Sequence, residues 1–290
     1  MRIVHLTAEA REASSAAARA GLGVGLVPTM GSLHEGHLSL VRRCREACRF
    51  TVASIFVNPT QFAPGEDLEA YPRNLERDAR LLGAEGVDLL FAPPPGEIYA
   101  PDHATWVEVE GLSRGLCGDH RPGHFRGVAT VVAKLFGIFR PAVACFGQKD
   151  FQQAAIVRRL ARDLDSGVTI LVCPTVREAD GLAMSSRNAF LSASERSAAP
   201  ALFAALDAAR RLAQSGSIRD PAAITASVRR DLEGTPLRLQ YVELGETTTL
   251  AAPERLSGEL VLAAAAHLGS TRLIDNVLID MNEGSDLHAT

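Results

Sequence analysis

Two histidines, His34 and His37, lie three residues apart in the stretch VPTMGSLHEGHLSLV, with Gly36 between them. A zincin helix needs histidines four residues apart in H-E-x-x-H, so this spacing argues against zinc. An apolar run precedes the histidines and a helical pattern follows them, which places them where backbone N–H groups face phosphate oxygens. We therefore expect an anion site here, with a simple polar helix start as the alternative.

A second candidate is the stretch FGQKDFQQ, where another apolar run leads into a helical pattern. Lys149 would supply a point charge for phosphate, and Gln152 and Gln153 offer neutral hydrogen bonds. The position favours a site because ligands of open parallel sheets bind beyond the carboxyl ends of the strands. The alternative is a solvated helix cap.

The third candidate is MSSRN, in which the hydroxyls of Ser185 and Ser186 lie beside the guanidinium of Arg187. Such a group of donors suits phosphate, and a loop that carries it could close over a nucleotide. The tripeptide is common by chance, so its weight comes from the other two phosphate-binding candidates.

Two segments could bind a second substrate. FVNPTQF places Asn58 and Gln61 after an apolar run, and HRPGHFRG places three basic side chains at a helix start, namely Arg121, His124 and Arg126. The alternatives are a turn residue for Asn58 and a solvated face for the basic segment.

Two further patterns are weaker. Asp78 could donate a carboxylate to Mg²⁺, although an aspartate flanked by Arg77 and Arg80 on a helix is more often an ordinary surface residue. GLGVG, at 21–25, precedes an apolar run instead of following it, so we expect a loop and not a dinucleotide fingerprint.

Short apolar runs alternate with helical patterns over the first part of the chain. Strands are expected at 23–29, 51–58, 87–93, 142–147 and 168–176, and helices at 36–49, 72–86, 125–139 and 149–164. This βαβα order predicts an α/β fold, a Rossmann-like doubly wound parallel sheet over 1–176.

The pattern changes after residue 176. Two helices are expected at about 192–214 and 220–233, followed by strands at 239–244, 259–267 and 271–279. Residues 177–290 are therefore predicted to form a smaller C-terminal α+β domain, whose last residues, 282–290, would fray.

Composition limits the function classes. The 290 residues are 47% hydrophobic and 22% charged, which is typical of a globular protein. A net charge of -4 argues against a broad nucleic-acid surface and favours small anionic ligands. The five scattered cysteines fit a reducing cytoplasm, and no apolar run is long enough to predict a membrane span.

Taken in order, these segments resemble the pantothenate synthetase (pantoate–β-alanine ligase) family. The resemblance rests on VPTMGSLHEGHLSLV, FVNPTQF, YPRN, RPGHFRG, FGQKDFQQ, VREADGLAMSSRN and TRLIDN, and covers nearly the whole chain. This family is part of the nucleotidyltransferase group in which HIGH-type and KMSKS-type motifs bind ATP. HEGH is similar to the first motif and MSSRN to the second.

The resemblance implies a residue-by-residue assignment. Residues for ATP binding would be Pro28, Met30, His34, His37, Gly147, Lys149, Asp150, Val176, Met184, Ser185, Ser186 and Arg187. Of these, His34, His37, Lys149, Ser185, Ser186 and Arg187 would be catalytic and Asp150 would bind the ribose. Pantoate would contact Gln61, Gln153 and Asn58, and Mg²⁺ would lie near Asp78 and Gln153. Arg77 and Cys117 depart from the acidic residues that relatives have at these positions.

The resemblance also implies an activity. ATP, pantoate and β-alanine would give pantothenate, AMP and pyrophosphate through a pantoyl adenylate, in a homodimer whose smaller domain acts as a lid. The alternative is an adenylyltransferase of a small metabolite that uses the same HIGH-type site. A non-catalytic nucleotide-binding protein belongs to another class, and a tRNA-charging enzyme fits the acidic charge poorly.

Overall fold

The computed structural model describes residues 1–63 and 65–282, which fold into two compact units. The first unit contains Met1–Ser113, Gly118–Gln148 and Gln153–Val176. The second contains Arg114–Cys117, Lys149–Gln152 and the described residues from Arg177 on. Two short segments of the N-terminal half therefore fold with the C-terminal half.

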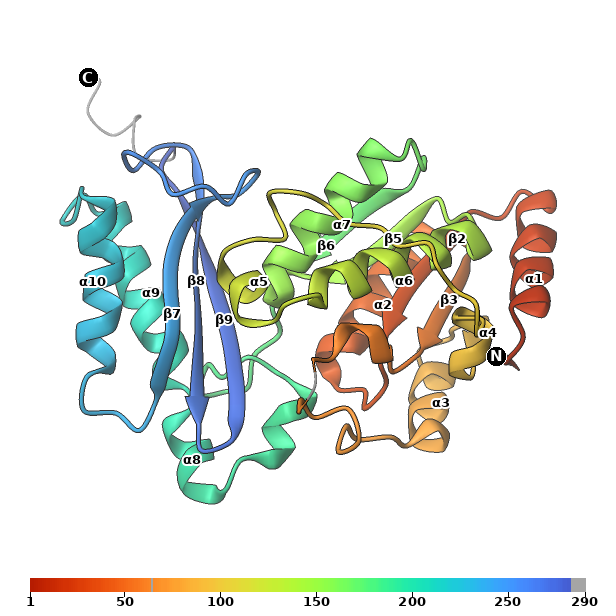
Figure 1. Cartoon of the computed structure of the whole chain (residues 1–290), viewed down its shortest axis with the longest axis horizontal. Helices are drawn as coiled ribbons and strands as arrows, with labels where there is room; N and C mark the ends of the chain where they lie inside the picture. The colour runs from red at the N-terminus through yellow and green to blue at the C-terminus, as the bar shows by residue number, and fades with distance from the viewer. Residues whose placement is uncertain (64, 283–290) are drawn as a thin grey trace. The chain divides into compact units, whose positions relative to one another are not determined.

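A six-stranded parallel sheet forms the centre of the first unit, with strand order β1-β4-β3-β2-β5-β6 (Figure 1). The strands are β1 (Arg2–Val4), β2 (Val24–Thr29), β3 (Phe50–Ile55), β4 (Leu89–Phe91), β5 (Val143–Gly147) and β6 (Thr169–Cys173). The strand order reverses beside β2, as in doubly wound folds, whose ligands bind at such switch points. The predicted Rossmann-like sheet is confirmed.

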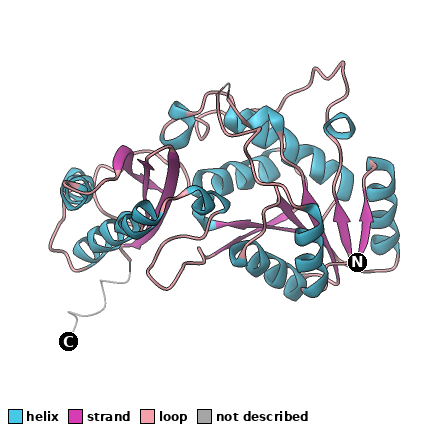
Figure 2. Ribbon diagram, turned by 90° about the horizontal axis from the view of Figure 1, so that it is seen from below, coloured by secondary structure: helices cyan, strands magenta, loops and turns pink. Residues whose placement is uncertain are grey.

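Helices cover both faces of this sheet (Figure 2). One face is covered by α2 (Glu35–Ala47) and α3 (Leu75–Ala84), and the other by α1 (Thr7–Arg19) and α6 (His124–Phe139). The remaining helices that lie wholly or partly in this unit are α4 (Pro95–Ile98), α5 (Leu116–His120) and α7 (Phe151–Asp163).

Close packing of β2 against α2 positions the segment that follows β2. A Cβ atom added to Gly25 would lie 2.3 Å from Cys44 Sγ, so only glycine permits this approach. Val27, Val41 and Cys44 are fully buried in the same core cluster. The end of β2 and the start of α2 are thus held by one packed interface.

The second unit contains a three-stranded antiparallel sheet, β7-β8-β9. Its strands are β7 (Arg238–Glu246), β8 (Glu259–Leu268) and β9 (Thr271–Asp280). Helices α9 (Ala201–Gln214) and α10 (Pro221–Leu232) pack on one face, and Leu116 and Phe151 pack on the other. Both faces are apolar, which explains why β8 reads as an apolar run without alternation.

Several details differ from the sequence prediction or extend it. The helices α1, α4 and α5 were not predicted, and the strand β1 was missed because three residues at a sheet edge carry no periodic signal. The helix expected at 192–214 is two helices, α8 (Ala193–Ala198) and α9, because Pro200 lacks the N–H that would continue the first one. The tail expected to fray lies, from residue 283 on, outside the described residues.

None of the helices in the described part of the chain has both the length and the apolar character that crossing a bilayer requires.

Candidate active site

The segment after β2 turns sharply before α2 begins. Gly31 and Ser32 both have positive φ, 84° and 52°. Thr29 Oγ1 donates to Ser54 O at 2.8 Å and accepts from Gly31 N at 3.1 Å, which ties the turn to β3. A Cβ at Gly31 would meet both Asp78 and Ile55 at 3.1 Å, so this position favours glycine on both conformational and steric grounds.

Asp78 on α3 holds the backbone of this turn. Its carboxylate accepts from Ser32 N at 2.7 Å and from Leu33 N at 3.0 Å, and its side chain is only 1% exposed. Arg77 Nη1 donates to Leu33 O at 3.0 Å and lies 3.3 Å from Asp78 Oδ1. Both carboxylate oxygens of the predicted metal ligand are therefore engaged by the protein.

His34 and His37 lie together at the N-terminus of α2. His34 occupies the N-cap, its backbone N donates to His37 Nδ1 at 3.3 Å, and the two ring centroids are 4.1 Å apart. Because Nδ1 of His37 accepts a hydrogen bond from the backbone N–H of His34, a neutral His37 ring carries its proton on Nε2. The capping role that we kept as an alternative is thus real, and it leaves His37 as a donor through Nε2.

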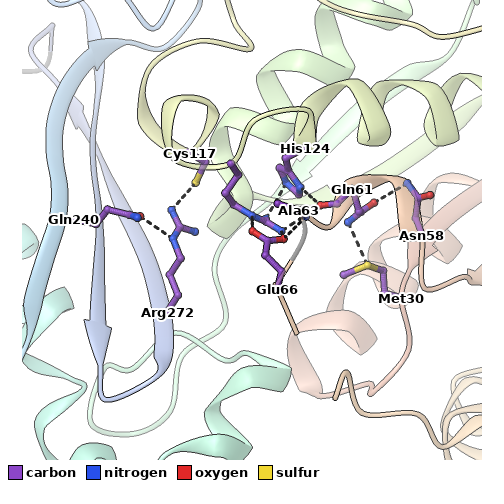
Figure 3. Close-up of polar contacts among 10 residues, drawn as sticks. Met30, Asn58, Gln61, Ala63, Glu66, Cys117, His124, Gln240 and Arg272 are labelled. Atoms are coloured by element: carbon purple, nitrogen blue, oxygen red, sulfur yellow. Dashed lines mark hydrogen bonds and ion pairs between the residues drawn. The ribbon is translucent and has the colours of Figure 1, made fainter. Parts of the chain in front are cut away.

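A buried amide network follows β3 (Figure 3). Asn58 is the N-cap of the 3₁₀ helix η1 (Pro59–Gln61) and is 1% exposed. Its Nδ2 donates to Gln61 Oε1 and to Gly127 O, both at 3.1 Å, and Gln61 Nε2 lies 3.2 Å from Met30 Sδ. The Gln61 amide therefore has a defined orientation, with its oxygen toward Asn58.

The acceptor side of Asn58 is equally saturated. Its Oδ1 accepts from Thr60 Oγ1 at 2.9 Å and from Tyr99 OH at 3.0 Å. Burial is the main reason that the pKa of Tyr99 is raised, so this phenol stays protonated and remains a donor. Asn58 thus acts on its surroundings through Gln61, and Tyr99 is a residue of this network that no sequence pattern signalled.

The basic segment before α6 also contacts Gln61. His124 Nδ1 lies 2.8 Å from Gln61 O, and Arg121 forms two hydrogen bonds with Glu66, at 2.7 and 2.6 Å. Burial acts to raise the pKa of Glu66, but Arg121, together with the hydrogen bond from Ala63 N and the nearby His124, lowers that pKa overall. Arg126 lies over the Trp106 ring at 4.7 Å instead. The segment is therefore largely paired within the protein.

Lys149 belongs to the second unit together with the KMSKS-type segment. Lys149 lies in η2 (Gln148–Asp150), after β5, and its carbonyl accepts from Asn276 Nδ2 at 3.0 Å. Asp150 ends the same 3₁₀ turn. The expected position after a strand end is confirmed.

The MSSRN segment follows a short hairpin in the second unit. Arg177 and Ala183 form an antiparallel bridge, and Asn188 Nδ2 donates to Ala183 O at 3.1 Å. Ser185 is the N-cap of η3 (Ser186–Phe190), and its side chain accepts from Arg187 N at 3.3 Å. The two serines and the arginine are thus held in one ordered turn.

The remaining predicted ATP and pantoate residues are distributed over the elements expected for them. Pro28 lies in β2, Gly147 ends β5, Gln153 lies in the first turn of α7, Val176 follows β6, and Met184 precedes Ser185, the N-cap of η3. Among the residues that the structure describes, no group of three or more histidine, cysteine or acidic side chains could hold a metal ion.

Cys117, Tyr241 and Arg272 form a second polar network, in the second unit. Figure 3 shows the contacts of Arg272 with Cys117 and with Gln240. Cys117 Sγ lies 3.2 Å from Tyr241 OH and accepts from Arg272 Nη2 at 3.3 Å, and Arg272 Nε donates to Gln240 Oε1 at 2.8 Å. Burial, followed by the neighbouring thiol, raises the pKa of Tyr241. Arg272 belongs to TRLIDN, a segment to which we assigned no role from the sequence.

Comparison with known proteins identifies the family. The family model for pantoate-beta-alanine ligase matches residues 2–278. The chain belongs to the pantoate–β-alanine ligase family. It is 48% identical to the pantothenate synthetase of Moorella thermoacetica over 284 residues, 98% of this chain and 100% of the relative.

Solved structures agree with the family assignment. The crystal structure of pantothenate synthetase from Thermus thermophilus superposes with a TM-score of 0.89 at 47% identity, over 96% of this chain and 99% of that one. That of pantoate-beta-alanine ligase from Francisella tularensis, complexed with beta-gamma ATP and beta-alanine, gives a TM-score of 0.79 at 32% identity, over 96% and 97%. The Rossmann-like fold and the ligase family are therefore both established for this chain.

Proposed function

We propose that this chain condenses pantoate with β-alanine at the expense of ATP, giving pantothenate, AMP and pyrophosphate. The observation that carries the proposal is the family match over residues 2–278. A relative of the same fold, from Francisella tularensis, is described as a complex with beta-gamma ATP and beta-alanine, two of the three substrates. The adenylyltransferase alternative has no comparable support.

The reaction has two balanced steps. A carboxylate oxygen of pantoate attacks the α-phosphorus of ATP, and the bond to pyrophosphate breaks, leaving pantoyl adenylate. The amine of β-alanine then attacks the acyl carbonyl and loses a proton, and AMP departs with the electron pair of the broken acyl–oxygen bond. Neither step needs a covalent bond to the protein, so positioning and charge stabilisation supply the catalysis.

Cations and N–H donors would bind the ATP phosphates. In the first unit, His34 and His37 would donate to phosphate oxygens, His37 through Nε2. In the second, Lys149 and Arg187 would neutralise the departing pyrophosphate, with the hydroxyls of Ser185 and Ser186.

The rest of the nucleotide would contact a further set of residues. Asp150 would accept hydrogen bonds from the ribose hydroxyls. The remaining contacts would come from Pro28, Met30, Gly147, Val176 and Met184.

Pantoate would be bound by the amides of Gln61 and Gln153. The hydrogen bond from Asn58 directs Gln61 Nε2 away from Asn58, which favours donation to a pantoate oxygen at the position now next to Met30 Sδ. Asn58 would therefore support pantoate binding through Gln61 instead of by direct contact. An analogue without the matching oxygen would leave this amide unpaired, which is a strong source of selectivity.

Mg²⁺ is implied by the family, but Asp78 fits poorly as its ligand. Its buried carboxylate already accepts two backbone N–H groups and faces Arg77. Gln153 alone would be a weak ligand. Mg²⁺ commonly enters such sites on the substrate phosphates and keeps several waters, so it would not need a carboxylate from the protein.

A homodimer and a cytoplasmic location complete the proposal. All five cysteines are free thiols, in agreement with a reducing compartment. Light scattering coupled to size-exclusion chromatography should give twice the mass of one chain. A single-chain mass at micromolar concentration would contradict the dimer.

One assay tests the proposed reaction. Purified chain is incubated with ATP, pantoate, β-alanine and Mg²⁺, and each organic substrate is omitted in turn while AMP and pyrophosphate are measured. Sustained release of both is expected only with all three, and omission of β-alanine should limit pyrophosphate to about one per chain. Sustained pyrophosphate release without β-alanine would support an adenylyltransferase. ATP binding without turnover would support a non-catalytic protein.

A further inference from the structure

Two adjacent polar residues of β9, Asp275 and Asn276, are buried within a sheet whose two faces are largely apolar. They are 4% and 2% exposed. Successive side chains of a strand point to opposite faces, so the two residues serve different sides of the sheet. Leu273, Val277 and Ile279 share the face of Asp275 and belong to the core cluster under α9 and α10.

Asp275 binds the hairpin that precedes the MSSRN segment. Arg177 donates to its carboxylate through Nη1 at 2.6 Å and Nη2 at 2.9 Å, and the same Nη1 donates to Gly181 O at 3.1 Å. The Arg177 guanidinium also lies 3.6 Å from the Phe203 ring centroid. A paired fork of this kind fixes direction as well as distance. The hairpin is thereby fastened to β9.

Asn276 binds the other cationic segment from the opposite face of the sheet. Its Nδ2 donates to Lys149 O at 3.0 Å. Phe151, two residues after Lys149, packs against the apolar cluster on this face. Two neighbouring residues of one strand therefore hold two segments that are far apart in sequence, both of which carry proposed phosphate-binding side chains.

We propose that Asp275 and Asn276 are positioning residues for ATP turnover, Asn276 acting through Lys149 and Asp275 through the Arg177 hairpin and the Ser185–Arg187 turn. The inference rests on the proposed function. A buried charge pair is a poor source of net stability compared with apolar packing, so its presence here is better explained by the geometry it specifies. Both side chains are too deeply buried to bind substrate themselves.

A double-mutant cycle tests the Asn276 assignment. Asn276→Leu removes the donor and keeps the same branching of the side chain, and we expect the KM for ATP to rise or kcat to fall by about tenfold, while the KM for pantoate stays within about twofold. In a Lys149→Ala background, the same Asn276→Leu change should have almost no further effect, because residues that act as a unit are not additive. The matched control is Asp280→Asn, on the same strand, which should behave as wild type in both backgrounds.

A purely structural role predicts another result. It would lower stability and affect every substrate alike, and Asn276→Leu would reduce activity by the same factor with and without Lys149; that outcome overturns the inference. If Asn276→Leu does not fold, Asn276→Ala gives the same test. Its neighbours on β8, Ala263 and Ala265, are already alanines, so a small side chain suits this part of the sheet. Absence of wild-type turnover with all three substrates would instead overturn the proposed function.

Asp275 is tested by its own conservative change. Asp275→Asn keeps size and one acceptor but removes the charge that pairs with Arg177. We expect about a tenfold loss in kcat/KM for ATP and faster amide hydrogen exchange in 181–190, with exchange in α9 unchanged. Unchanged exchange in 181–190 together with unchanged ATP kinetics would refute the assignment.

Discussion

At the level of single residues, the geometry of His37 lets one side chain combine a capping interaction with the catalytic role proposed for it. The bond from His34 N to Nδ1 belongs to the helix start, whereas Nε2 carries the proton that a phosphate oxygen would accept. The sequence alone presented these roles as alternatives. The geometry allows both, because the two ring nitrogens point in different directions.

Substitutions of His37 can separate the two roles. His37→Ala should lower kcat by about 10² to 10³, the usual effect of losing one transition-state donor. His37→Gln places an amide donor near the position of Nε2 and should recover part of this loss, whereas His37→Asn replaces mainly Nδ1 and should recover less. Steady-state kinetics on folded variants provide the test. Equal activity of the Gln and Asn variants would contradict the assignment of Nε2.

Asp78 is a second residue whose contacts redefine its role. Asp78→Asn keeps one acceptor oxygen but replaces the other with an NH2 group, which cannot accept from the backbone N–H that faces it. We therefore expect a loss of about 1 to 3 kcal/mol in the free energy of unfolding. The KM for ATP should rise because the turn before His34 loosens, while the Mg²⁺ concentration for half-maximal activity stays constant. Glu76→Gln, on the exposed side of the same helix, is the control. A large shift in the Mg²⁺ requirement would restore Asp78 as a metal ligand.

The Glu66–Arg121 pair gives a pH dependence with a definite sign. In the folded protein the pKa of Glu66 lies below its ordinary value of 4.5. The pair therefore contributes its full stabilisation of the folded state above pH 4.5, and this contribution is lost as the pH falls through the folded pKa. The free energy of unfolding of the wild type should exceed that of Glu66→Gln by about 1 to 3 kcal/mol at pH 7, and this difference should become smaller as the pH falls. Urea unfolding at several pH values measures it. Glu12→Gln, which breaks an exposed pair with Arg19, should show no such trend.

At the element scale, the close packing of α6 on η1 determines where Gln61 lies. A Cβ at Gly127 would be 2.4 Å from Thr60 O and 2.8 Å from Gln61 N. The backbone of η1 can therefore lie directly against α6 only because Gly127 has no side chain. Gly127 O also accepts from Asn58. Helix, turn and amide network are therefore one unit of packing, in which a change in the helix is expected to reach Gln61.

Two glycines of α6 provide a matched comparison. Gly127→Ala must push η1 away from the helix, so we expect a loss of about 1 to 3 kcal/mol in stability and a raised KM for pantoate. Gly137→Ala, on the same helix with nothing within 4 Å of the new Cβ, should be neutral or stabilise by up to about 1 kcal/mol. Thermal unfolding and pantoate kinetics give both readouts. An unchanged KM for pantoate in Gly127→Ala would argue against the coupling.

At the scale of the whole molecule, the two units do not follow the order of the chain. The boundary that the sequence suggested, near 176, lies where the first unit ends at Val176 and the long segment of the second unit begins at Arg177. The second unit also takes Arg114–Cys117 and Lys149–Gln152 from the N-terminal half. Leu116 and Phe151, from these two segments, cover the face of the small sheet that carries Tyr241 and Val261.

A fragment cut at that boundary should therefore fold poorly. Residues 177–290 alone would expose the face around Tyr241 and Val261, and we expect self-association and a broad, low-temperature thermal transition. Size exclusion and circular dichroism, compared with the full chain and with full-length Leu116→Ala, test this. A monomeric fragment that melts cooperatively at the temperature of the full chain would show that Leu116 and Phe151 are dispensable.

The class of fold and the segments that carry the candidate site could be predicted from local sequence patterns. Apolar runs bounded by glycine and proline are a local sign of buried strands, so five of the six parallel strands could be predicted, together with the four longer helices between them, α2, α3, α6 and α7. The short helices α4 and α5 could not. The motifs HEGH and MSSRN could be found for the same reason, since their residue types and spacing lie within a few positions. Mg²⁺ binding by Asp78 and the other site roles stay predictions.

The contacts of each side chain depend on the packing of segments that are distant in sequence. The sequence suggested Asn58 as a substrate ligand, but burial and five hydrogen bonds direct it to Gln61 and its surroundings. Nothing near Tyr99, Asp275 or Asn276 in sequence indicates their partners, which are 41, 98 and 127 positions away. Such contacts form when segments distant in sequence pack together, so they cannot be predicted from a pattern that spans only neighbouring residues.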